Sequence, residues 1–210
     1  MTSNQWDDHY AKKARAENWR ARSVYKLEEI NDKIKLFKPG DKVLDLGCYP
    51  GSWSQYVLSK ISSSGKLIGI DLKKPKDLPT PSFRFIQEDI FNINKEVISS
   101  MPEAPFSVVL SDMAPSTTGI RNIDTSRSIE LALKALEIAI ASLVPKGKFL
   151  CKILEGEDIK IFINQLNSHF SETRLFRPKA TRKRSTEVFV YANGFIGERN
   201  WKPPSQEPSR

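Results

Sequence analysis

The sequence predicts an α/β fold, in which helices cover both faces of a mostly parallel sheet of seven strands. Short apolar runs alternate with longer stretches whose apolar residues recur at helical spacing, an order typical of βαβ units. The first apolar run, residues 43–46, leads into a turn that contains Gly47 and Gly51. A strand, a glycine turn and a helix start form a ligand site at the carboxyl edge of a parallel sheet. The turn lacks GxGxxG and GK[ST] spacing, which disfavours a nucleotide phosphate as the ligand.

Composition limits the classes of protein that need to be considered. The chain has 210 residues, and 33 basic against 25 acidic residues give a net charge of +8, which favours a polyanionic partner. No apolar run approaches the roughly 18 residues of a membrane span, so we expect no membrane segment. The two cysteines and two histidines are scattered, so we expect no metal and no disulfide framework, and a cytoplasmic location. We expect one domain over residues 1–200, with a basic arm at about 1–22 and a disordered tail at 201–210.

The basic arm allows two interpretations. It is either a solvated, partly helical segment or a segment that contacts phosphates. Its candidate phosphate contacts are Lys12, Lys13, Arg15, Arg20 and Arg22. An amphipathic helix follows from residue 24 to about residue 34, and Ser23 is placed to cap it. Pattern alone favours a surface position for Lys26, in the first turns of that helix.

Acidic residues mark the ends of four predicted strands. These strands are 43–46, 66–72, 83–90 and 106–112, and their acids are Asp45, Asp71, Asp89 and Asp112. A row of carboxylates at one sheet edge suits a cationic ligand. Asp71 follows Gly51 at the distance of about 20 residues at which a second-strand acid meets ribose hydroxyls. A helix over 53–60 follows the first strand, with Ser52 expected as its cap.

The second half continues the alternation. We expect helices at 94–100, from 124 or 125 to about 143, and at 158–170, with strands at 148–154, 171–178 and 187–192. Lys152 interrupts an apolar strand; a buried charge must find a partner or lose its proton, so we favour a functional role for it. The loop at 179–185 carries Arg182, Lys183 and Arg184. It is either a solvated face or, together with the arm, a surface for nucleic acid.

Four separated blocks of sequence resemble the RrmJ/FtsJ family of ribose 2'-O-methyltransferases. The blocks are RSVYKL at 22–27, LDLGCYPGSWSQ at 44–55, LSDMAP at 110–115 and RKRSTE at 182–187. Their common order makes the resemblance specific, and it extends from about residue 6 to residue 195. Tyr49 departs from the family, whose members often have alanine at this position.

The resemblance implies a Rossmann-like fold, S-adenosylmethionine as methyl donor, and a catalytic tetrad of Lys26, Asp112, Lys152 and Glu187. Lys152 would be the general base that takes the proton of a ribose 2'-hydroxyl. The resemblance also implies donor contacts by Gly51, Trp53, Asp71, Asp89 and Asp112, with Asp71 at the ribose and Asp89 at the adenine amino group. Asp45 and Gly47 join this set because they lie in the same strand and turn.

The compact chain most resembles the bacterial enzymes that methylate a uridine of 23S ribosomal RNA in the large ribosomal subunit. We therefore expect a monomer that acts on ribosomal RNA. Three alternatives stay open: an enzyme of the transfer RNA anticodon loop, a small-molecule methyltransferase, and a non-catalytic RNA-binding protein. The first would act on another RNA, the second would not need the basic segments, and the third would not need the tetrad.

Overall fold

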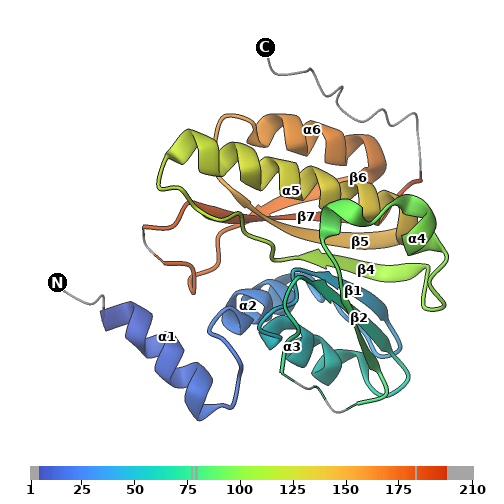
Figure 1. The fold of residues 1–210 in the computed structure, drawn as a ribbon, viewed down its shortest axis with the longest axis horizontal. Coiled ribbons are helices and arrows are strands. Elements are labelled where there is room, and N and C mark those ends of the chain that lie inside the picture. The colour runs from blue at the N-terminus through green and yellow to red at the C-terminus, as the bar shows by residue number, and fades with distance from the viewer. Residues whose placement is uncertain (1–4, 77, 79, 183, 198–210) are drawn as a thin grey trace.

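A computed structural model describes residues 5–76, 78, 80–182 and 184–197, and one seven-stranded sheet runs through this part of the chain (Figure 1). The strand order is β3-β2-β1-β4-β5-β7-β6. β7 is antiparallel to both of its neighbours, whereas β1 to β5 pair in parallel. The strands are β1 (Lys42–Leu46), β2 (Lys66–Asp71), β3 (Phe83–Gln87), β4 (Phe106–Ser111), β5 (Leu143–Leu154), β6 (Phe170–Phe176) and β7 (Glu187–Phe195). The predicted α/β fold with a mostly parallel sheet is confirmed.

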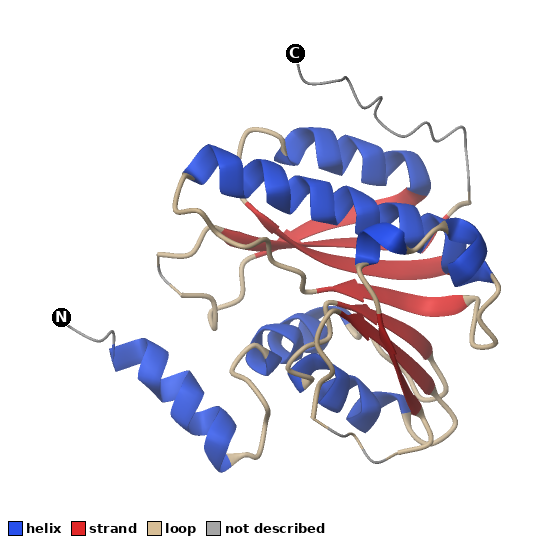
Figure 2. Cartoon of the chain, in the orientation of Figure 1, coloured by secondary structure: helices blue, strands red, loops and turns tan. Residues whose placement is uncertain are grey.

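Helices cover both faces of this sheet (Figure 2). On one face lie α2 (Val24–Ile34) and α3 (Ser52–Ile61), with α1 (Gln5–Ala16) beside them; on the other lie α4 (Lys95–Ser99), α5 (Arg121–Ser142) and α6 (Ile159–His169). Alternate strand residues supply two apolar clusters, because successive side chains of a strand point to opposite faces. Val43 packs in the cluster under α2 and α3, and Leu44 packs in the cluster under α5 and α6.

The strand order places a site at the centre of the sheet. From β1 the chain proceeds outward through β2 to β3 and then returns to form β4 on the other side of β1. The loops after β1 and β4 therefore diverge at a topological switch point, where α/β sheets bind ligands beyond the carboxyl ends of their strands.

Several element boundaries differ from the predicted ones. β3 ends at Gln87, before Asp89, because the Asp89 side chain accepts a hydrogen bond from the Phe91 amide and begins a short 3-10 turn, η1 (Ile90–Asn92). β5 begins at Leu143, five residues before the expected start at 148, and Lys146 at φ 65° is an irregularity within the strand. The other boundaries differ from the expected ones by a few residues.

Two expected helix caps are wrong, and the long helix expected from residue 124 or 125 begins earlier. Neither Ser23 nor Ser52 caps a helix with its side chain; their hydroxyls bond each other at 2.8 Å. Asp124 is already inside α5, which starts at Arg121. Its carboxylate instead accepts hydrogen bonds from the backbone amides of Thr118 and Gly119, and these bonds connect the loop before α5 to the helix.

The basic arm is helical over α1 and is attached to α2. The ring of Tyr10 lies 5.4 Å from the ring of Tyr25, and the Lys13 amine lies 4.5 Å from the same Tyr25 ring centre. Ala14 is buried in the cluster beneath. The tail expected at 201–210 lies outside the described residues.

Candidate active site

A pocket of about 420 Å³ opens beyond the carboxyl ends of β1 to β4. Four of the seven residues expected to bind the donor line it, namely Gly47, Asp71, Asp89 and Asp112. Gly47 has φ 77°, and a Cβ there would lie only 2.6 Å from Met113 Cγ, so the turn needs glycine to approach the β4 loop. The structure thus brings three of the four strand-terminal carboxylates together in one concave site.

Backbone amides hold two of these carboxylates in place. Asp71 accepts hydrogen bonds from the Tyr49 amide at 2.9 Å and from the Lys73 amide at 2.9 Å. Asp89 accepts one from the Phe91 amide at 3.0 Å. A carboxylate has about four acceptor positions, so each retains capacity for a ligand.

The other three expected donor residues do not line this pocket. Gly51 faces Arg20 and Pro75. Trp53 is 2% exposed, with its indole directed to the Ser23 carbonyl. Asp45 is fully buried within β1, and its Oδ2 accepts a hydrogen bond from the Ser54 hydroxyl.

Sequence analysis missed the apolar rim of the pocket. Tyr49, Leu72 and Phe91 line it and are 52%, 62% and 48% exposed, and Met113 and Leu131 lie deeper. Leu72 directly follows β2, and Tyr49 and Phe91 lie three and four residues beyond the ends of β1 and β3, so their places in the loops after these strands were a usable signal. Leu131 lies on α5, and no local pattern distinguishes it from a core residue.

Burial raises the pKa of Asp45 to about 7; the charges of Asp112 and Asp71 add to this rise, and the Ser54 hydroxyl opposes it. Between about pH 4 and 7 the folded protein therefore holds a proton that the unfolded chain releases. The free energy of unfolding must fall as the pH rises through this range, by up to roughly 4 kcal/mol.

The Asp45→Asn variant tests this pH dependence, because it keeps an acceptor for Ser54 but cannot titrate. Denaturant unfolding of both proteins at several pH values should show wild-type stability falling relative to the variant between pH 4 and 7. Parallel pH profiles for the two proteins would contradict the raised pKa.

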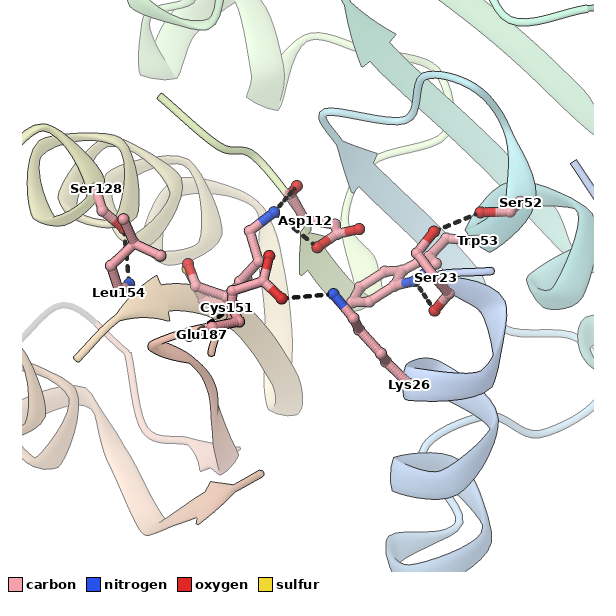
Figure 3. A network of polar contacts seen from close by, with 11 residues as sticks. Ser23, Lys26, Ser52, Trp53, Asp112, Ser128, Cys151, Leu154 and Glu187 are labelled. Atoms are coloured by element: carbon pink, nitrogen blue, oxygen red, sulfur yellow. Dashed lines mark hydrogen bonds and ion pairs between the residues drawn. The ribbon is translucent and has the colours of Figure 1, made fainter. Parts of the chain in front are cut away.

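The four residues of the expected tetrad meet as two ion pairs, and Figure 3 labels three of them, Lys26, Asp112 and Glu187. Lys152 Nζ lies 3.0 Å from Asp112 Oδ1 and donates to the Asp112 carbonyl at 2.6 Å. Lys26 Nζ donates to Glu187 Oε2 at 2.6 Å. Lys152 is 7% exposed, so the buried charge expected in this strand has its partner. The Lys26 side chain is only 12% exposed, which corrects the surface position that its local pattern favoured.

The two pairs also act on each other. Burial alone would raise the pKa of Glu187, but the charge and hydrogen bond of Lys26, together with the charge of Lys152, hold it below its ordinary value. Glu187 is therefore a carboxylate that holds the Lys26 amine by a hydrogen bond and also feels the charge of Lys152. Asp112 lines the carboxylate pocket as well, so the tetrad borders that pocket directly.

A second pocket, of about 430 Å³, lies on the other side of the tetrad and is basic. Its charged lining is Arg22, Lys26, Arg182, Arg184 and Glu187. Arg22 donates to the Ala180 carbonyl at 3.0 Å, so the arm and the 179–185 loop do meet here.

The other basic candidates lie elsewhere. On α1, Lys13 pairs with Glu17 and Arg15 bonds the Ala11 carbonyl; Lys12 lies on the same helix. Arg20 donates to the Lys76 carbonyl, near Gly51. Lys183 is outside the described residues.

Comparisons with known proteins show which family the chain resembles. A model of the family described as FtsJ-like methyltransferase matches residues 19–195. The ribosomal RNA large subunit methyltransferase E of Desulfatibacillum aliphaticivorans is 46% identical over 188 residues, which are 89% of this chain and 90% of the relative. The protein of the same name from Bdellovibrio bacteriovorus is 44% identical over 187 residues, 87% of this chain and 94% of the relative. A crystal structure titled as a ribosomal RNA methyltransferase of Plasmodium falciparum superposes with a TM-score of 0.75 at 28% identity, covering 86% of this chain and 100% of that one.

The fold and the pocket thus define a Rossmann-like methyltransferase. The chain belongs to the FtsJ-like methyltransferase family, as its four sequence blocks indicated. Within the described part of the chain, no helix is long and apolar enough to cross a membrane. The same residues contain no group of three or more His, Cys, Asp or Glu side chains suited to a metal ion.

Proposed function

We propose that the protein transfers a methyl group from S-adenosylmethionine to the 2'-hydroxyl of a uridine ribose in 23S ribosomal RNA of the large ribosomal subunit. One observation carries the proposal. Lys26, Asp112, Lys152 and Glu187 come from four distant segments and meet between a carboxylate pocket and a basic pocket. A cationic donor suits the first pocket, a polyanionic acceptor suits the second, and the amines lie between them.

The carboxylate pocket fits S-adenosylmethionine in size and chemistry. Its volume of about 420 Å³ is ordinary for a small-molecule site. Carboxylates suit the sulfonium charge and the ribose hydroxyls, and the apolar side chains of Ile90, Phe91 and Leu131 suit an adenine ring. We propose that Asp71 holds the ribose and Asp89 the adenine amino group. Asp45, Gly51 and Trp53 remain predicted to bind the methyl donor. They would do so through their backbone atoms or by supporting the pocket from below.

S-adenosylmethionine, when bound, supplies an electrophilic methyl group. In the proposed mechanism Lys152 accepts the 2'-hydroxyl proton at Nζ. Asp112 fixes this Nζ through its carboxylate and its carbonyl, at 3.0 and 2.6 Å. Lys26, held by Glu187, stabilises the negative charge that develops on the ribose oxygen. Because the hydroxyl must be held in line with the methyl group, positioning by these four side chains supplies much of the acceleration.

We propose RNA as the methyl acceptor for two reasons, the basic pocket and the names of the relatives. Arginine side chains suit phosphate groups because they offer several fixed donors. The relatives are named as ribosomal RNA large subunit methyltransferases, which favours ribosomal over transfer RNA. We further expect the enzyme to act as a monomer in the cytoplasm, where ribosomal subunits are available.

Mapping the transferred methyl group tests this function. The purified protein is incubated with labelled S-adenosylmethionine and with large subunits from cells that lack the enzyme, and the 2'-O-methyl positions are then mapped. We expect one new 2'-O-methyl uridine in the large-subunit RNA. Methylation of a base, of transfer RNA alone, or of no RNA at all would contradict the proposal.

Arg184 provides a test of the RNA surface. It is exposed and lines the basic pocket, so Arg184→Ala should weaken RNA binding and lower the slope of log affinity against log salt by about 1. Arg84→Ala is the matched control, because Arg84 lies on the distant strand β3 and pairs with Glu103. Equal salt slopes for wild type and Arg184→Ala would remove this residue from the RNA surface.

A further inference from the structure

The side chain of Trp53 joins three elements that build the active site. It follows the glycine turn as the second residue of α3 and is 2% exposed. Its indole Nε1 donates to the Ser23 carbonyl at 3.0 Å, and its ring lies 5.7 Å from the ring of Phe189 on β7. Trp53 therefore contacts the residue that precedes α2 and a residue of β7, and these two elements supply Lys26 and Glu187.

On the α2 side, two side chains of α3 hold the same residue. Ser23 accepts the indole hydrogen bond at its carbonyl, and its hydroxyl bonds the hydroxyl of Ser52 at 2.8 Å (Figure 3). Ser23 directly precedes α2, and Lys26 lies three residues further, within its first turn. The position of the Ser23 backbone thus determines where the Lys26 side chain starts.

On the β7 side, the indole packs against the ring of Phe189, which lies near Glu187, the ion-pair partner of Lys26. Phe189 is fully buried and lies two residues after Glu187, so the two side chains share one face of the strand. The Lys26 amine lies 5.8 Å from the centre of the Phe189 ring. A shift of the indole would therefore move both the start of α2 and the support of the Lys26–Glu187 pair.

We propose that Trp53 is a positioning residue that keeps the Lys26 amine on the Glu187 carboxylate. This role rests on the proposed function, because it presumes that Lys26 acts in methyl transfer. This role is not a contact between the Trp53 side chain and the methyl donor, since the indole does not line the carboxylate pocket. A buried indole N–H needs a hydrogen-bond acceptor, and here the acceptor is the carbonyl of Ser23, three residues before Lys26.

The Trp53→Phe variant removes the indole N–H and keeps an aromatic ring. Tyr56→Phe is the matched control: it removes the buried 3.1 Å bond between Asn31 and Tyr56, another link between α2 and α3 that lies further along both helices. The assays are methyl transfer to undermethylated large subunits at saturating donor, donor binding by calorimetry, and thermal unfolding. For Trp53→Phe we expect kcat to fall about tenfold or more, with donor affinity within about threefold of wild type. Tyr56→Phe should lose similar stability and keep its kcat.

Three outcomes would overturn the positioning role: an unchanged kcat in Trp53→Phe, an equal loss of kcat in both variants, or a loss of donor affinity that accounts for the lost activity. Inactive wild-type enzyme would instead refute the proposed function. The geometry can be tested without activity, because a crystal structure of Trp53→Phe should show the Lys26–Glu187 contact lengthened from 2.6 Å. An unchanged contact in that crystal would refute the positioning role by itself.

Discussion

Lys152→Met should abolish methyl transfer, lowering kcat by about a thousandfold or more, while S-adenosylmethionine still binds. The variant loses the only proposed proton acceptor, and general-base groups contribute about 10²–10⁴ in rate. Methionine keeps the apolar stem of lysine, so the strand should still pack. Loss of the Lys152 amine leaves the charge of the Asp112 carboxylate unbalanced beside the pocket. The cationic methyl donor should therefore bind as well as before or more tightly. Activity assays and calorimetry on the same preparation measure both effects.

Lys148→Met is the matched control for this experiment. Lys148 also lies on β5, but its amine donates to the carbonyls of Lys35 and Leu36, which directly follow α2. This variant should lose some stability and keep its kcat. If Lys152→Met lost donor binding together with activity, Lys152 would have a structural role and another group would be the base.

Asp71→Ala should weaken S-adenosylmethionine binding by about a hundredfold. Asp71 presents a carboxylate to the pocket, and a charge-assisted hydrogen bond contributes about 1.5–3 kcal/mol. The substitution also releases the amides of Tyr49 and Lys73, so the rim of the pocket loses its support. Calorimetric titration with the donor, and with its product S-adenosylhomocysteine, measures the change.

The control for Asp71→Ala is Glu96→Ala, which removes one negative charge from the exposed surface of α4. It should leave donor affinity unchanged, which separates a local contact from the net charge of the protein. Equal donor affinity in Asp71→Ala and wild type would contradict the proposed ribose contact.

The sequence was sufficient to predict the centre of the sheet because β1, β2 and β4 are short, largely apolar and bounded by glycine, proline or an acid. It also placed Asp71, Asp89 and Asp112 at one edge, because parallel strands end together. The sequence did not show that Asp45 differs from the other three strand-terminal acids. Asp45 lies one residue before the end of β1 and is buried beneath the pocket. A shift of one residue along a strand reverses the face of a side chain.

The tetrad could not be found from local pattern. Lys26 sits in an ordinary amphipathic helix, and Glu187 opens an ordinary strand; only the resemblance to the family indicated them. Their meeting depends on β7 running antiparallel beside β5, which places Glu187 opposite Leu154, near Lys152. The link through Trp53 was invisible for the same reason, since Ser23 and Phe189 lie on separate elements.

A crystal structure of the protein with S-adenosylhomocysteine tests the central claim most directly. We predict that the product occupies the pocket between Asp71, Asp89 and Asp112, with its sulfur on the side of the pocket that faces Lys152. A product molecule bound outside this pocket, or with its sulfur directed away from the two lysines, would contradict the account.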